Sequence, residues 1–170
     1  MSKYPYMWRL LFLALLLLGV FFSCRRLPNV QGEGSSLLQG VWNQDSVQNA
    51  NQLLNYTQHK FKFTCDSFYV DMITHSKANY YADSCFNNGV WKEYAKGVYQ
   101  VRSDSVFLTG TFTKANYKQK ISGCYQIGQY IKIFKIKLAD TGRLLLEGTD
   151  NQREVDLRLV EKITCTPQSL

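Results

Sequence analysis

The chain contains few side chains of the kinds that usually perform catalysis. General acid–base catalysis most often uses histidine, and the sequence has only His59 and His75, interpreted as a strand-edge residue and a solvated residue beside a polar loop. Asp66, Asp71 and Asp83 lie close together in the sequence, but only Asp71 falls inside an expected strand, where it points outward. No nucleotide-binding, zinc-protease or serine-hydrolase motif occurs. The sequence therefore predicts no catalytic residue, no metal site and no cofactor, and a protein that is not an enzyme.

The first residues of the chain have the layout of a secretory signal. Lys3 and Arg9 form a positive region, and residues 10–22 are apolar apart from one glycine. An apolar core this short is typical of an export signal rather than of a spanning helix, and no later apolar run approaches the roughly 20 residues that a span needs. We therefore expect residues 1–23 to be a signal peptide.

The end of this segment resembles a bacterial lipoprotein signal. In that family a peptidase cuts before a cysteine whose thiol carries diacylglycerol, and Ser23–Cys24 matches the last two positions, with Phe21 in place of the usual leucine. The resemblance implies a lipid anchor on Cys24, whose acyl chains would contribute about 0.8 kcal/mol per buried methylene. Arg25 and Arg26 follow and can meet anionic headgroups. Because an acidic run at this place directs surface display in some Gram-negative lineages, the arginines favour a periplasm-facing location in the cell envelope, with surface display as the alternative.

The segment after the lipidated cysteine is expected to be a tether. Residues 27–36 are rich in Gly, Ser and Pro, and a flexible chain from residue 24 to 36 reaches roughly 20 Å. Without residues 1–23 the chain has 18 basic and 13 acidic residues, a net charge of +5. The lysines cluster at 114, 118, 120, 132, 135 and 137, and the last three alternate with Ile and Phe, as on the solvated side of a strand. We expect a solvated basic face and no nucleic-acid partner, because nucleic-acid sites favour arginine-rich patches with stacking aromatics.

The remaining sequence indicates one all-β domain over residues 37–170. From residue 38 onward apolar and polar side chains alternate between turn residues, and aromatic residues, 14% of the chain, favour strands. About eight strands are expected, from the ranges 38–43, 59–65, 68–74, 90–94, 97–102, 105–113, 124–138, 143–147 and 154–163, with one helical turn between 45 and 56. Near Phe134 the inward-facing frame is expected to slip by one residue through a β-bulge. A closed antiparallel barrel of about eight strands leaves no free edge.

Two short patterns resemble lipocalin-like barrels. Residues 38–42, Leu-Gln-Gly-Val-Trp, are similar to the first-strand G-x-W signature of that family. Residues 97–110 are similar to the G-x-Y-x-V, turn, x-L hairpin of small lipocalin-like bacterial lipoproteins. The resemblance implies an eight-stranded, antiparallel, up-and-down barrel. It also implies a barrel-end signature formed by Gly40, Trp42 and an arginine near the last strand, Arg158 or Arg153, on which the Trp42 ring would pack.

Four cysteines lie beyond Cys24, namely Cys65, Cys85, Cys124 and Cys165. Their gaps of 20, 39 and 41 residues differ from the close pairs of zinc sites, and an even number in an exported domain suggests two disulfides. In an up-and-down meander, alternate turns lie at the same barrel end. This parity favours Cys65–Cys165 with Cys85–Cys124, and pairing between sequence neighbours is the alternative.

Tyrosines gather around the two long polar connections of the expected barrel. Tyrosines at a loop mouth can stack on sugars or clamp apolar ligands, and they also commonly fill barrel ends. The residues of a possible binding face are Tyr80, Tyr81, Tyr94, Tyr117, Lys118 and Lys120. The sequence therefore supports two hypotheses. The first is a membrane-anchored envelope lipoprotein that binds a small apolar or amphiphilic ligand or an envelope partner. The second is a structural or interaction lipoprotein without a ligand cavity.

Overall fold

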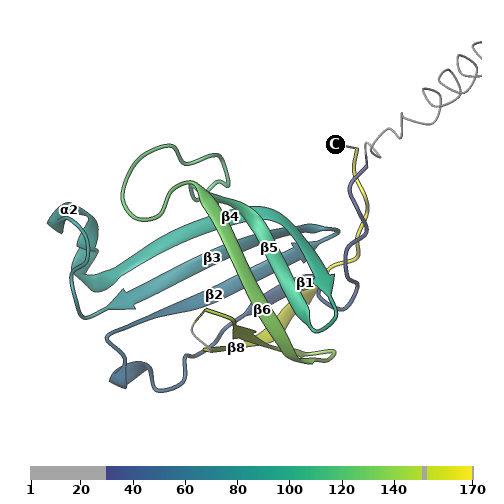
Figure 1. Ribbon diagram of the computed structural model, residues 1–170, viewed down its shortest axis with the longest axis horizontal. Coiled ribbons are helices and arrows are strands. Elements are labelled where there is room, and N and C mark those ends of the chain that lie inside the picture. Colours follow the sequence, from purple (N-terminus) through teal and green to yellow (C-terminus); the bar gives the residue numbers. More distant parts are fainter. Residues whose placement is uncertain (1–29, 151–152, 170) are drawn as a thin grey trace, which may run out of the picture. The chain divides into compact units, whose positions relative to one another are not determined.

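The computed structural model describes residues 30–150 and 153–169, and it shows an all-β protein (Figure 1). The signal peptide expected at 1–23, the cysteine Cys24 and the arginines Arg25 and Arg26 lie outside the described residues. One compact unit spans Gln31–Gln168. The tether expected over residues 24–36 therefore overlaps the barrel unit from residue 31 onward.

Eight strands in the described part of the chain form a closed antiparallel barrel. They are β1 (Gly40–Asn43), β2 (Asn55–Thr64), β3 (Ser67–Ser76), β4 (Val90–Arg102), β5 (Ser105–Thr113), β6 (Gln129–Ala139), β7 (Arg143–Gly148) and β8 (Glu154–Lys162). Each strand pairs with the next, and β8 pairs with β1. The up-and-down lipocalin-like barrel predicted from the sequence is confirmed.

The two ends of the barrel have different connections (Figure 1). We call the end with the short turns after β2, β4 and β6 the closed end. We call the end with the longer connections after β1, β3, β5 and β7 the open end. The short helices η1 (Ala50–Gln52), α2 (Asp83–Phe86) and η2 (Asn87–Gly89) lie in connections of the open end. The helical turn expected between residues 45 and 56 is therefore η1.

Two strand boundaries differ from the sequence-based expectation. Strand β4 is continuous, although two separate strands are expected from the sequence at 90–94 and 97–102. Gly97 stays in the ladder because it lies against Gly110 of β5, where an added Cβ would be 2.1 Å from the carbonyl oxygen of Thr109. Strand β6 begins at Gln129 rather than at 124, because the preceding residues, with Gly128 at a φ of 86°, belong to the open-end connection.

The frame of β6 also differs from the expectation. Buried and half-buried residues show that Tyr130, Lys132, Phe134 and Ile136 face inward without a slip at Phe134. The register shift occurs later, between Ile136 and Leu138. The expectation was wrong because the outward-facing isoleucines of β6 were taken as core residues. As a result Lys132 faces the barrel interior, not the solvated side of the strand.

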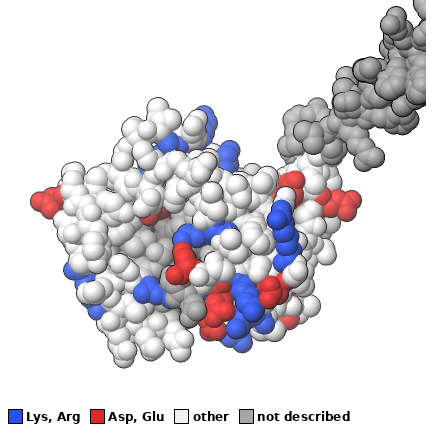
Figure 2. Space-filling model, viewed as in Figure 1, with Lys and Arg blue, Asp and Glu red and all other residues white. Residues whose placement is uncertain are grey.

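The lysines of β6 each have an acidic partner, so they do not form an isolated basic face. The pairs are Lys132–Asp150 at 2.5 Å, Lys135–Asp104 at 3.4 Å and Lys137–Glu147 at 3.5 Å. On the face shown in Figure 2, basic and acidic side chains are interspersed.

The closed end is filled with apolar side chains. Fully buried residues in this core include Leu38, Trp42, Phe61, Phe63, Phe68, Leu108, Leu144 and Leu157. The segment before β1 covers this end, because the backbone N–H of Ser35 donates to the Tyr99 hydroxyl at 3.0 Å. The disulfide Cys65–Cys165 joins the β2–β3 turn to the chain after β8. This disulfide and the pair Cys85–Cys124 are the pairing that strand parity favours.

The barrel-end signature is present only in part. Gly40 is required by close approach, since an added Cβ would lie 2.8 Å from the backbone carbonyl oxygen of Glu161 in β8. Trp42 is buried, and its indole N–H donates to the Leu38 carbonyl at 2.6 Å. Arg158 does not cover this ring. It lies on the outer face, with a side chain 71% exposed and paired to Asp45 at 3.6 Å, because its position in β8 alternates with the inward-facing residues.

Candidate functional site

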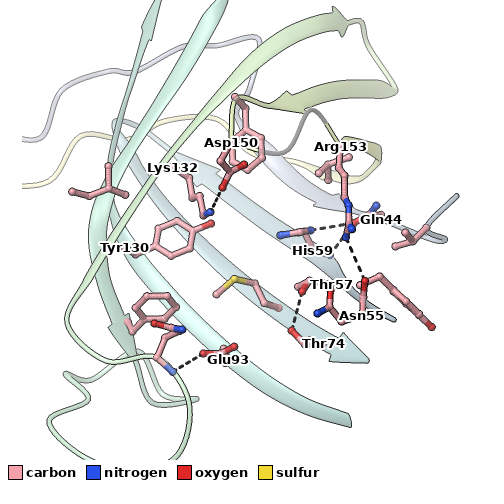
Figure 3. A pocket seen from close by; sticks show the side chains of 18 of the residues that line it. Gln44, Asn55, Thr57, His59, Thr74, Glu93, Tyr130, Lys132, Asp150 and Arg153 are labelled. Atoms are coloured by element: carbon pink, nitrogen blue, oxygen red, sulfur yellow. Dashed lines mark hydrogen bonds and ion pairs between the residues drawn. The ribbon is translucent and has the colours of Figure 1, made fainter. Parts of the chain in front are cut away.

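The open end of the barrel contains a cavity of about 530 Å³ (Figure 3). Four apolar side chains that line the cavity also belong to the core or pack against it, namely Met72, Phe112, Phe134 and Val155. We call these four side chains the floor of the cavity. The polar residues that line it and are labelled in Figure 3 are Gln44, Asn55, Thr57, His59, Thr74, Glu93, Tyr130, Lys132, Asp150 and Arg153. The barrel is therefore filled at one end and hollow at the other.

His59 occupies an inward-facing position of β2, two residues before the buried Phe61. Its ring stacks on Phe61 with centroids 5.7 Å apart, and its Nδ1 lies 3.2 Å from Oε1 of Gln44 (Figure 3). Burial, together with the positive charge of Lys132, lowers the pKa of His59 from 6.5 to about 4. The imidazole is therefore neutral at physiological pH.

Tyr130 lies on β6, across the barrel from His59. The ring is 3% exposed and packs edge-to-face on Phe112 with centroids 5.4 Å apart. Burial and the charge of Asp150 raise the pKa of the phenol above its ordinary value, so the hydroxyl keeps its proton. Figure 3 shows the hydroxyl pointing into the cavity, below the ion pair between Lys132 and Asp150.

Charged residues of both signs line the rest of the cavity. Glu93 of β4 accepts hydrogen bonds from the Gln126 backbone N–H at 2.9 Å and from the Trp91 indole at 3.1 Å. Arg153 donates to the Asn55 carbonyl at 3.3 Å. Because these charges already have protein partners, the mouth of the cavity is polar without a strong excess of either sign.

Two open-end connections are joined beside this mouth. The disulfide Cys85–Cys124 links the β3–β4 and β5–β6 connections, and the Tyr125 hydroxyl donates to the Cys85 carbonyl. Tyr81 packs edge-to-face on Trp91 and on Tyr125, and the last two rings stack with centroids 5.2 Å apart. We call these three residues the aromatic cluster. The cluster is part of the site boundary because Trp91 holds the Glu93 carboxylate that faces the cavity.

Other candidate residues lie on the outer surface rather than at the cavity. Tyr117 packs between Tyr69 and Tyr94, with ring centroids 5.0 and 6.3 Å away, and its hydroxyl donates to Asp71. Burial and the neighbouring Asp71 carboxylate raise the pKa of the Tyr117 phenol. This contact fastens the β5–β6 connection to the outside of β3 and β4.

The possible binding face predicted from the sequence is therefore divided. Tyr81 belongs to the aromatic cluster, and Tyr94 and Tyr117 form the outer contact. The ammonium group of Lys120 donates to the Gln126 carbonyl at 3.0 Å and lies 5.7 Å above the Tyr125 ring. Tyr80, which is 60% exposed, and Lys118 extend into solvent.

No known family model, curated protein or solved structure matches this chain. Among residues 30–150 and 153–169, no three His, Cys, Asp or Glu side chains converge on a point where they could hold a metal ion. The helices within the same ranges are too short or too polar to cross a bilayer.

Sequence reasoning missed most of the cavity lining. The sequence suggests an edge position for His59, but this residue lies two positions before the buried Phe61 and therefore faces inward with it. Lys132 was assigned to a solvated face because the frame of β6 was misplaced. Arg153 was considered as a partner for Trp42 but lines the cavity instead. The useful signal was a polar residue at an inward position next to an aromatic core residue.

Proposed function

We propose that the chain is a lipid-anchored protein of the cell envelope, facing the periplasm, whose lipocalin-like barrel binds a small amphiphilic molecule in the open-end cavity. The main support for a small ligand is the cavity itself. A volume of about 530 Å³ falls inside the roughly 300–1,000 Å³ typical of small-molecule sites. An apolar floor below a polar mouth suits a molecule with apolar and polar parts.

A cavity-filling substitution tests this proposal. Thr74 lines the cavity, and its hydroxyl hydrogen-bonds to Thr57 at 2.9 Å. Thr74→Trp should occupy the cavity and weaken binding of the uncharged fluorescent probe N-phenyl-1-naphthylamine at least tenfold. The matched control is Thr109→Trp, because Thr109 is an exposed strand residue on the outer face. Equal probe binding by both variants, or no binding by the wild type, would contradict a ligand in this cavity.

The membrane anchor is proposed from the sequence around Cys24. In a bacterium that matures lipoproteins, the wild-type chain should incorporate an alkyne analogue of palmitate, and Cys24→Ala should not. Arg26→Ala is the control and should retain the label, because it leaves the acylated thiol in place. Retention of the label by the Cys24 variant would show that the lipid, if any, is attached elsewhere.

A docking role for the lysine- and tyrosine-rich connections has less support. Tyr117 and Lys120, which such a surface would use, are engaged within the chain by Asp71 and by the Gln126 carbonyl. The cavity is the feature whose side chains remain directed toward open space.

A further inference from the structure

The charged side chains that line the cavity have protein partners. Lys132 is paired with Asp150, and Glu93 accepts two hydrogen bonds from the protein. His59 and Tyr130, in contrast, extend from opposite walls next to the apolar floor (Figure 3). Each packs on a floor or core ring, His59 on Phe61 and Tyr130 on Phe112. Beside the floor, the cavity therefore presents a neutral imidazole and a neutral phenol.

The contacts of Gln44 determine which nitrogen of His59 carries the proton. Oε1 of Gln44 accepts the backbone N–H of His59 at 3.1 Å, so this atom is the amide oxygen. The same oxygen lies 3.2 Å from Nδ1 of His59, and an oxygen can only accept there. Nδ1 therefore carries the proton, and Nε2 is a hydrogen-bond acceptor. Within the described residues Nε2 has no protein partner, and the ring edge away from Gln44 faces the cavity (Figure 3).

Tyr130 supplies the complementary group. Its hydroxyl is directed into the cavity and has no hydrogen-bond partner among the described residues (Figure 3). A hydroxyl that lines a cavity is satisfied there by a ligand or by water, because leaving it unpaired costs free energy. Next to the floor, the cavity thus presents one acceptor, on His59, and one donor, on Tyr130, on facing strands.

We infer that the cavity admits an uncharged ligand end that carries a hydroxyl or primary amide group, which donates to Nε2 of His59 and accepts from the hydroxyl of Tyr130. This inference rests on the proposed function and specifies the chemistry of its ligand. A carboxylate would meet the lone pair of Nε2, and Lys132, whose charge acts on His59, is already paired with Asp150. An ammonium group would place a charge against apolar walls, where an unpaired ion is strongly disfavoured. The remainder of the ligand is apolar beside Met72 and Phe134.

Two isomers test the donor requirement directly. 1-Decanol and 1-methoxynonane have the same atoms, but only the alcohol can donate a hydrogen bond, and the ether is the more hydrophobic of the two. In competition against N-phenyl-1-naphthylamine, 1-decanol should displace the probe at a concentration about fivefold lower than the ether, as expected for one net hydrogen bond. Decanoate, of similar chain length, should compete more weakly than 1-decanol at pH 7.5.

Variants of His59 and Tyr130 test whether these two residues cause the preference for the alcohol over the ether. His59→Phe should remove the preference for the alcohol over the ether. Tyr130→Phe should weaken the binding of both the alcohol and the ether, because both can accept a hydrogen bond from the phenol. His75→Phe is the control, since His75 stacks on Tyr56 away from the floor, and it should keep the wild-type preference. If His59→Phe does not fold, His59→Gln and the ¹⁵N shift of Nε2 on adding 1-decanol replace it.

The outcomes separate this inference from the proposed function. If the probe binds but the ether competes as well as the alcohol, or decanoate competes best, the inference is wrong and the binding function stands. If the Nε2 resonance does not move when 1-decanol displaces the probe, the contact with His59 is wrong. If the probe does not bind the wild type at all, the proposed ligand-binding function itself fails.

Discussion

The closed and open ends of this barrel are built from the same strands but have opposite interiors. Along β2, inward positions pass from Phe63 and Phe61 at the closed end to His59 and Thr57 at the open end. Along β3 they pass from buried apolar residues to Thr74. At the closed end aromatic rings fill the interior, whereas at the open end smaller and polar side chains leave a cavity of about 530 Å³. The inward-facing positions of a strand therefore change from apolar to polar at the point where the packed core ends and the cavity begins.

The connections of the two ends differ in the same sense. At the closed end, short turns and the segment that includes Ser35 lie against the core. At the open end, longer connections are fastened by Cys85–Cys124 and by contacts at their margins, including Tyr117 with Asp71. The closed end should therefore carry most of the stability, and the open end should carry most of the binding.

Removing each disulfide in turn tests this division most strongly. In the chain-entropy account, Cys65→Ala/Cys165→Ala opens a loop with a sequence separation of 100 and should lower the free energy of unfolding by about 4.7 kcal/mol. Cys85→Ala/Cys124→Ala, with a separation of 39, should lower it by about 4 kcal/mol. Urea unfolding at 25 °C measures both.

Probe binding distinguishes the two disulfide variants. The open-end double variant should change the affinity for N-phenyl-1-naphthylamine under conditions where it remains folded, because the two connections beside the cavity mouth are no longer joined. The closed-end variant should keep the affinity of the wild type while folded. A closed-end variant that is the more stable of the two would break the proposed division.

Matched phenylalanine truncations should differ between the two ends. Phe63 is fully buried and packs against Phe61 and Tyr99, so Phe63→Ala should lower the free energy of unfolding by about 4 kcal/mol. Phe112 lines the existing cavity, and Phe112→Ala should cost about 2 kcal/mol, because water can enter the space that it leaves. Equal losses in urea unfolding would mean that the open end is as tightly packed as the core.

The sequence allowed the barrel and its disulfide pairing to be predicted for a physical reason. The alternation of apolar and polar residues around Phe61, Phe63 and Phe68 can be recognised within each single strand. The disulfide pairing depends only on which end of the barrel each turn lies at. A cavity depends on the combined volume of side chains from several strands, which no single strand reveals. The β6 frame was misplaced because apolar residues face outward there, so periodicity alone did not indicate which face was buried.

The conformation of the β5–β6 connection could not be predicted in this way. Tyr117 and Tyr125 adopt positive φ values of 56° and 66°, which are uncommon for residues other than glycine. These conformations turn Tyr117 onto the outer wall and Tyr125 onto Trp91. The sequence indicated a tyrosine-rich loop, but the tertiary contacts with Asp71 and Trp91 determine which rings face the site.

The open end should also be the more sensitive to acid through His59. The unfolded chain binds a proton on this imidazole below about pH 6.5, whereas the folded protein resists protonation until about pH 4. Stability therefore falls as the pH is lowered from 7 to 4. Because the ring faces a cavity that water can enter, we expect a loss of about 2 kcal/mol, less than the full shift implies.

Comparison with variants isolates this contribution from the carboxylates that titrate in the same range. On going from pH 7 to pH 4, the wild type should lose about 2 kcal/mol more of its free energy of unfolding than His59→Phe does. The wild type and His75→Phe should change together, because both retain His59. A constant difference between the wild type and His59→Phe would mean that the imidazole is solvated in the folded protein.

The smallest difference is expected between two ion pairs. At the closed end, Arg143 forms a two-bond contact with Asp156 at 2.8 and 2.9 Å, which lowers the pKa of Asp156. At the open end, Lys132 forms a single contact with Asp150 at 2.5 Å, with side chains 44% and 54% exposed. Arg143→Met should lower the free energy of unfolding more than Lys132→Met does, because a planar two-bond contact is stronger than a single contact between exposed side chains. In urea unfolding, both losses should be smaller at high salt than at low salt, because salt screens the ion pairs. A cost above 2 kcal/mol for Lys132→Met would show that this pair is shielded from water, and the cavity mouth would then belong to the stable core rather than to the binding end.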